Sequence, residues 1–232
     1  MKNYKNKYFS ILGDSISTFE GCSQPREAAY YDTARKIQSG VLTHADTWWG
    51  KVIERLEGEL LVNNSISGST VCWHPSYQVA SYGCSDERTA ALDKDGATPD
   101  VIMVYLGTND WGAGMAVNAR AKGEEGNLSL FANAYKAMLA KLKTNYPNAE
   151  IWCLTLPISR CTAKKNFQFP HYYAGRNILE YNEAISNCGE SLGCRVIDLS
   201  QNEEEFDTLD GFHPNASGME TIARGVIEQL KK

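Results

Sequence analysis

The stretch VIMVYLGTND, residues 101–110, decides the fold class. Six apolar residues that stop at a glycine and a polar turn are typical of a short strand buried on both faces. Similar apolar runs recur along the chain, each ending at a polar or glycine-rich turn, at residues 9–12, 60–63, 151–156 and 195–199. The sequence therefore predicts about five short, buried strands.

Helical patterns lie between these runs. Apolar residues recur with a spacing of three and four from Leu128 to Leu142, and Pro147 then stops the helix. Further helices are predicted at 48–56 and at 178–192, and Pro214 is expected to open a last one. Strands that alternate with helices predict an α/β fold with a parallel sheet covered on both faces. Without repeats or linker-like segments, residues 1–232 are interpreted as a single domain.

Composition excludes several classes of protein. Hydrophobic residues make up 43% and charged residues 22% of the chain, which excludes a disordered, collagenous or coiled-coil protein. The net charge of −5 gives no electrostatic reason to expect nucleic acid as a partner. No apolar run reaches the length of a membrane span or of a signal-peptide core, so we expect a cytoplasmic protein, or a secreted one if a leader has been removed.

The seven cysteines form no C-x-x-C pair. Cys72, His74, Cys84 and Asp86 lie near one another in sequence, but their spacing matches no metal-ligand pattern. No metal site is therefore expected.

Four polar segments follow the predicted strands or open the last helix. Ser15 lies in Gly13-Asp14-Ser15, Gly68 in NSISGS at 64–69, and Asn109 in GTND at 107–110. Asp210 precedes His213 by three residues, close enough to bind its Nδ1 and orient the ring as a base. Each segment has a simpler interpretation, such as a helix cap, a Gly/Ser turn or an Asx turn. Together they supply a nucleophile, a base, an orienting carboxylate and oxyanion donors, the groups needed for acyl transfer from a serine.

These blocks, in this order from residue 13 to 213, resemble those of the SGNH (GDSL-type) hydrolase family. The resemblance implies a three-layer α/β/α sandwich of the flavodoxin-like kind with about five parallel strands. It implies that Ser15 is the nucleophile, His213 the base and Asp210 its orienting carboxylate. An oxyanion hole would combine the N–H groups of Ser15 and Gly68 with the Asn109 amide. Neither a metal nor an organic cofactor is implied, and the substrate class is esters.

The alcohol and acyl parts of the substrate are less defined. Long irregular segments at 18–46, 73–99 and 157–176 are typical of functional loops. Aromatic residues in or near the last two could form a platform for a sugar ring or could anchor the loops to the core. They are Trp73, Tyr77, Trp111, Phe167, Phe169, Tyr172 and Tyr173, with His74 and His171 among them.

From these and the catalytic blocks, Asp14, Trp73, Trp111 and Tyr172 are the candidate substrate contacts. The absence of a long apolar lid-like helix favours a small-molecule, short-chain or carbohydrate O-acetyl ester. A lysophospholipase, a thioesterase, an acyltransferase and a catalytically silent module that binds acyl ligands are the alternatives.

Overall fold

The five apolar runs form one parallel sheet. The computed structural model describes residues 2–23, 29–73, 81–118, 123–124, 126–202 and 204–232. The strand order is β2-β1-β3-β4-β8, which is the flavodoxin-like order, with its topological switch point between β1 and β3. These strands are β1 (Tyr8–Gly13), β2 (Glu59–Ser65), β3 (Val101–Tyr105), β4 (Glu150–Leu154) and β8 (Arg195–Ile197).

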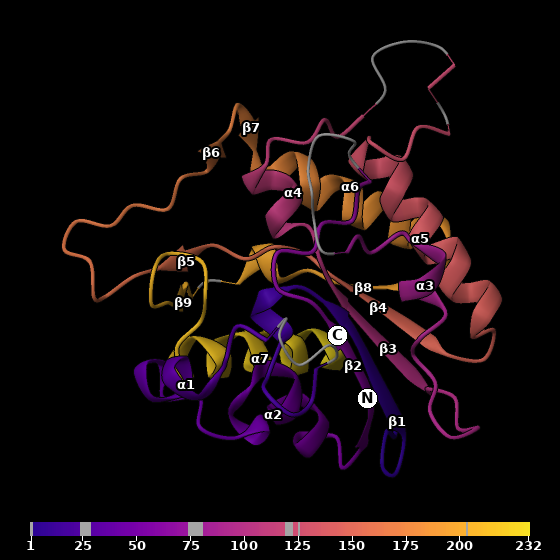
Figure 1. Ribbon diagram of the computed structural model, residues 1–232, viewed down its shortest axis with the longest axis horizontal. Coiled ribbons are helices and arrows are strands. Elements are labelled where there is room, and N and C mark those ends of the chain that lie inside the picture. Colours follow the sequence, from indigo (N-terminus) through magenta and orange to yellow (C-terminus); the bar gives the residue numbers. More distant parts are fainter. Residues whose placement is uncertain (1, 24–28, 74–80, 119–122, 125, 203) are drawn as a thin grey trace.

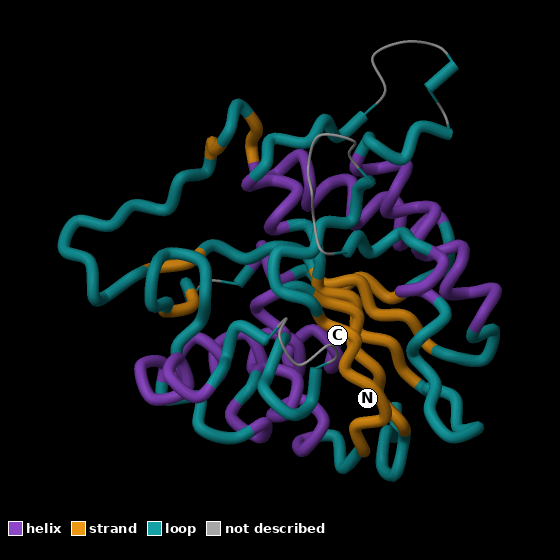
Figure 2. The backbone as a smooth tube through the Cα atoms, in the orientation of Figure 1, coloured by secondary structure: helices purple, strands orange, loops and turns teal. Residues whose placement is uncertain are grey.

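Helices cover both faces of this sheet. Figures 1 and 2 show α2 and α7 on one side and α5 and α6 on the other, so the predicted three-layer α/β/α sandwich is confirmed. The helices are α1 (Thr33–Ser39), α2 (Trp48–Arg55), α3 (Asp86–Thr89), α4 (Thr108–Gly112), α5 (Phe131–Asn145), α6 (Ile178–Ser191) and α7 (Ala216–Lys231). Single 3₁₀ turns lie at Ser15–Ser17, His44–Asp46 and Leu199–Gln201.

Burial follows the sequence pattern. Every residue of β3 is buried, as expected for the central strand of a sheet covered on both sides. Trp48 and Trp49 on α2 are fully buried, and both indole N–H groups bond to Ser17, at its side chain and its carbonyl respectively. Helix α2 therefore holds the turn that follows β1.

Several boundaries differ from the prediction by a few residues. Helix α5 begins at Phe131 instead of Leu128, because the preceding residues 127–130 form a turn. Pro214 lies before α7, whose first turn is capped by the Asn215 side chain. The last strand ends at Ile197, and Leu199 packs into the core from a 3₁₀ turn.

The irregular segments contain short elements that have no periodic pattern. Residues 157–176 form two of them, β5 (Ser159–Arg160) and β6 (Tyr172–Tyr173). Strand β5 pairs with β9 (Phe206–Asp207), and β6 forms a hairpin with β7 (Arg176–Asn177). The β5–β9 pair joins this segment to the stretch just before Asp210.

Within the described residues, no helix is long and apolar enough to cross a membrane. All seven cysteines are free thiols, and five of them are buried. Of the four residues considered as metal ligands, His74 lies outside the described residues, as does Tyr77 among the aromatic candidates. The described part of the chain holds no cluster of three or more His, Cys, Asp or Glu side chains that could bind a metal.

Candidate active site

The turn after β1 presents Ser15 at the carboxyl end of the sheet. The Asp14 carboxylate accepts a hydrogen bond from the Ile16 N–H at 3.0 Å and so caps this turn. Gly13 is required by packing, since a Cβ there would lie 2.7 Å from the Cβ and Oγ atoms of Ser17. Ser15 is only 7% exposed.

A chain of two hydrogen bonds joins the loop before α7 to this turn. Nε2 of His213 lies 2.9 Å from Oγ of Ser15, and Nδ1 of His213 lies 2.7 Å from Oδ2 of Asp210. The other oxygen of Asp210 accepts the backbone N–H groups of Phe212 and His213, each at 2.9 Å. The structure thus brings Ser15 together with Asp210 and His213, which follow it in the chain by almost 200 positions.

These contacts keep Asp210 ionised. Partial burial opposes the charge, but the hydrogen bonds from the His213 ring and backbone outweigh it and hold the pKa of Asp210 well below its usual range. A carboxylate bound to Nδ1 leaves Nε2 as the proton acceptor toward Ser15.

Asn109 and Gly68 lie beyond β3 and β2. Nδ2 of Asn109 donates one of its two N–H groups to the carbonyl of Ser69 at 2.9 Å. Gly68 has φ +77°, in the left-handed region that favours glycine. Among the described residues, no group accepts a hydrogen bond from the N–H of Ser15 or of Gly68.

Asp110 holds the segment after Gly68 in place. This carboxylate is fully buried and accepts the backbone N–H groups of Val71 and Cys72 at 2.8 and 2.9 Å. Burial raises the pKa of Asp110 to about 6, while these two N–H groups oppose the increase. The residue next to Asn109 therefore fixes the segment to which the Asn109 amide also bonds.

A cavity of about 240 Å³ opens onto the candidate triad. Its lining residues are Ser15, Ile16, Thr108, Asn109, Gly112, Tyr173, Phe212 and His213. A much smaller apolar cavity, of about 20 Å³, shares the walls Ile16, Thr108 and Phe212 with it. Trp111 and Phe169, whose rings stack at 5.4 Å, also line this small cavity.

The four candidate substrate contacts occupy different positions. Asp14 is 1% exposed and caps the turn after β1, whereas Trp111 is 1% exposed and lines the small apolar cavity. Tyr172 is 65% exposed and Trp73 47%, but neither lines the cavity beside Ser15. The aromatic residue of the hairpin that does line it is Tyr173.

Sequence reasoning missed two residues that contact the site. The Tyr30 ring stacks on the imidazole of His213, although it lies in an irregular segment without any pattern. Arg88 is buried, and its guanidinium donates to the carbonyls of Gly13 and Asn64 and to the hydroxyl of Ser69. Arg88 therefore ties the ends of β1 and β2 to the segment that carries Gly68.

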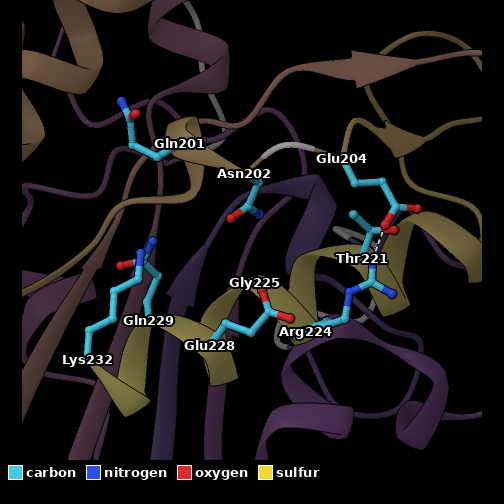
Figure 3. A pocket seen from close by; sticks show the side chains of 9 residues that line it. All are labelled: Gln201, Asn202, Glu204, Thr221, Arg224, Gly225, Glu228, Gln229 and Lys232. Atoms are coloured by element: carbon cyan, nitrogen blue, oxygen red, sulfur yellow. Dashed lines mark hydrogen bonds and ion pairs between the residues drawn. The ribbon is translucent and has the colours of Figure 1, made fainter.

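A separate cavity of about 360 Å³, with mostly polar walls, lies along α7 (Figure 3). Its lining includes none of the residues of the candidate triad. Arg224 there forms an ion pair with Glu204, and the small residue Gly225 makes room for Asn202. Among its described lining residues, none is a nucleophile hydrogen-bonded to a base, in contrast to the cavity at Ser15.

The family profile of GDSL-like lipase/acylhydrolase proteins matches residues 7–163. The chain belongs to the GDSL-like lipase/acylhydrolase family. As a member of this family, the chain is classed as a carboxylic ester hydrolase. Ser15, Gly68 and Asn109 lie inside the matched residues, whereas Asp210 and His213 lie beyond them.

Solved structures of GDSL-like lipases support the assignment over the whole chain. One from Bacteroides ovatus is 29% identical, with a TM-score of 0.73, and the match covers 98% of this chain and 99% of that one. Another, from Bacteroides uniformis, is 30% identical, with a TM-score of 0.71, and covers 97% and 96%.

One curated relative is the cellulase/esterase CelE of Acetivibrio thermocellus, 22% identical over 135 residues. The match covers 57% of this GDSL-like hydrolase and 14% of the relative, so the chain matches only a small part of that protein.

Proposed function

We propose that this chain hydrolyses short-chain carboxylic esters, with Ser15 as nucleophile, His213 as general base and Asp210 as its orienting carboxylate. The observation that carries this proposal is the pair of hydrogen bonds, 2.9 and 2.7 Å long, that runs from Ser15 through His213 to Asp210.

The first half-reaction forms an acyl-enzyme. Oγ of Ser15 attacks the ester carbonyl as its proton passes to Nε2 of His213, and the carbonyl oxygen becomes an oxyanion. The N–H groups of Ser15 and Gly68 and the second N–H of the Asn109 amide bind that oxyanion. When the carbon–oxygen bond to the alcohol breaks, His213 returns the proton to the departing alcohol.

The second half-reaction releases the acid. Water gives a proton to His213 and attacks the acyl carbon, and the proton then returns to Oγ of Ser15 as the carboxylic acid leaves. No group is oxidised or reduced. Asp210 stays ionised throughout and stabilises the imidazolium that forms twice in each turnover.

The small apolar cavity favours a short acyl group. A cavity needs about 10–15 Å³ to hold one water molecule, so a volume of about 20 Å³ suits a methyl group and no long chain. The rings of Trp111 and Phe169 close its far side. The larger open cavity, bordered by Tyr173, then receives the alcohol part. Because the relative CelE is a cellulase/esterase, we propose a carbohydrate as that alcohol.

The test measures kcat/KM for p-nitrophenyl acetate, butyrate and octanoate with the wild type and with Ser15→Ala. We expect the highest value with acetate, a decrease of at least tenfold at octanoate, and background rates for Ser15→Ala. Equal kcat/KM values out to octanoate would refute the short acyl group, and full activity of Ser15→Ala would refute the nucleophile.

Phe169→Ala tests the cavity itself. Removing this ring enlarges the space behind Ile16 and Phe212, so the ratio of butyrate to acetate kcat/KM should increase about tenfold. The acetate value serves as the internal control. An unchanged ratio would show that the acyl group lies elsewhere.

A further inference from the structure

The Tyr30 ring lies flat against the imidazole of His213. The ring centroids are 3.6 Å apart and the planes differ by 6°, so the two rings overlap face to face. The Tyr30 hydroxyl lies 3.4 Å from Oδ2 of Asp210, the same oxygen that binds Nδ1 of His213. Tyr30 does not line the cavity beside Ser15, so any effect it has on the reaction passes through His213.

Hydrogen bonds between side-chain hydroxyls and the backbone hold this stack in place. The Tyr30 N–H donates to Oγ1 of Thr18, and that hydroxyl donates to the carbonyl of Ser15, each at 2.8 Å. The hydroxyl of the next residue, Tyr31, donates to the carbonyl of Pro214 at 2.7 Å. The stack is thus fixed to the turn of Ser15 and to the loop of His213.

The geometry suits a charged imidazole better than a neutral one. Neutral aromatic rings prefer offset or edge-to-face contacts, because their negative faces repel each other. A cation over the face of a tyrosine ring is attracted instead. His213 becomes a cation when it takes the proton of Ser15, so the stack strengthens at the step that needs it.

Among the described residues, the other charged groups near this stack belong to Asp210, Lys164 and Arg35. The Asp210 carboxylate binds the imidazole, and the Lys164 ammonium bonds to the backbone carbonyl of Asp210. The Arg35 guanidinium lies 4.7 Å from the centroid of the Tyr30 ring and is paired with Asp32. Arg35 competes for the Tyr30 ring, while its pairing with Asp32 reduces that competition.

We propose that Tyr30 is a positioning residue that fixes the His213 ring between Ser15 and Asp210 and selectively stabilises its protonated form. This inference rests on the proposed function, because it assigns Tyr30 a part in the same proton transfer.

The test compares Tyr30→Leu with Tyr30→Phe. Leucine removes the ring face, so kcat/KM should fall about tenfold and the acidic limb of its pH profile should move about 0.5–1 pH unit lower. Phenylalanine keeps the ring face and loses only the long contact to Asp210, so its acidic limb should stay within about 0.3 unit of the wild type. An unmoved limb in folded Tyr30→Leu, or the same shift in both variants, would overturn the proposal.

One further measurement keeps the test independent of folding. Fluorinated phenylalanines at position 30 weaken the negative ring face with little change of shape, and the acidic limb should move lower with each added fluorine. If the acidic limb is the same in all variants at position 30 while Ser15→Ala still abolishes turnover, the role proposed for Tyr30 is refuted and the proposed function stands.

Tyr4→Leu is the matched control. Tyr4 is buried and, like Tyr30, it contacts an aromatic ring (Trp152, at 5.2 Å) and donates its hydroxyl to a carboxylate (Glu150, at 3.2 Å). It should lose stability and keep the acidic limb of the wild type. If the acidic limb moves as far in Tyr4→Leu as in Tyr30→Leu, the effect is a general consequence of lost packing and the proposal is overturned.

Discussion

Replacing Gly68 by alanine separates backbone strain from the chemistry of its N–H group. Gly68 has φ +77°, and a Cβ built on it meets no atom of the described residues within 4 Å. The substitution therefore adds no clash, and its cost is that of an L-residue in the left-handed region, about 1–2 kcal/mol. Any further loss of activity must come from movement of the N–H that we place in the oxyanion hole.

Gly96 provides the matched control, because it has φ +82° and equally open surroundings. It lies before β3, at the opposite end of the sheet from Ser15. Both Gly68→Ala and Gly96→Ala should lower the free energy of unfolding, measured in urea, by the same 1–2 kcal/mol or so. Only Gly68→Ala should lower kcat, by about 10- to 1,000-fold, since losing one oxyanion donor costs up to 10²–10³. Equal kcat values in the two variants would remove Gly68 from the oxyanion hole.

Three further outcomes follow from the geometry. Asn109→Ala should lower kcat by about two orders of magnitude with little change in KM. The control Asn145→Ala removes a hydrogen bond from a side-chain amide to the Thr89 carbonyl, far from Ser15, and should leave kcat unchanged. An unchanged kcat in Asn109→Ala would contradict its role in the oxyanion hole. Burial raises the pKa of Asp14 from 3.8 to about 7, so its contribution to stability is fully present below about pH 4 and is lost as the pH rises to 7. Asp14→Asn, which keeps an oxygen for the Ile16 N–H, should therefore gain stability relative to the wild type between pH 4 and 7 in urea titrations, by at most about 4 kcal/mol, and parallel curves would refute the raised pKa. Arg88→Lys should lower the free energy of unfolding by about 2–4 kcal/mol, because a single ammonium cannot reach the carbonyls of Gly13 and Asn64 and the hydroxyl of Ser69 at once. A loss below about 0.5 kcal/mol would show that other hydrogen bonds replace these three.

The sheet and most of the candidate site could be predicted because their signals are local. A strand buried on both faces must be apolar throughout, as 101–105 is, and residues at the carboxyl ends of parallel strands must lie near one another. That rule alone brings Ser15, Gly68 and Asn109 to one edge. His213 and Asp210 could be paired because only three residues separate them.

The remaining contacts depend on tertiary packing that leaves no trace in the sequence. Tyr30 lies in a segment without hydrophobic periodicity, and its stack on His213 exists only once the turn of Ser15 and the loop before α7 have met. Trp111 and Tyr172 are both aromatic residues near strand ends, but Trp111 points into the core and Tyr172 into solvent. Composition cannot distinguish these two outcomes, because an aromatic ring suits a core and a ligand platform equally well.

The role of Ser15 is tested most directly by reaction with a fluorophosphonate, followed by mass spectrometry of the labelled peptide. We expect one adduct, on Ser15, which disappears in Ser15→Ala and forms far more slowly in His213→Gln, because Nε2 of His213 lies 2.9 Å from the attacking oxygen. An adduct on another residue, or equal labelling of Ser15→Ala, would contradict the assignment of Ser15 as the nucleophile.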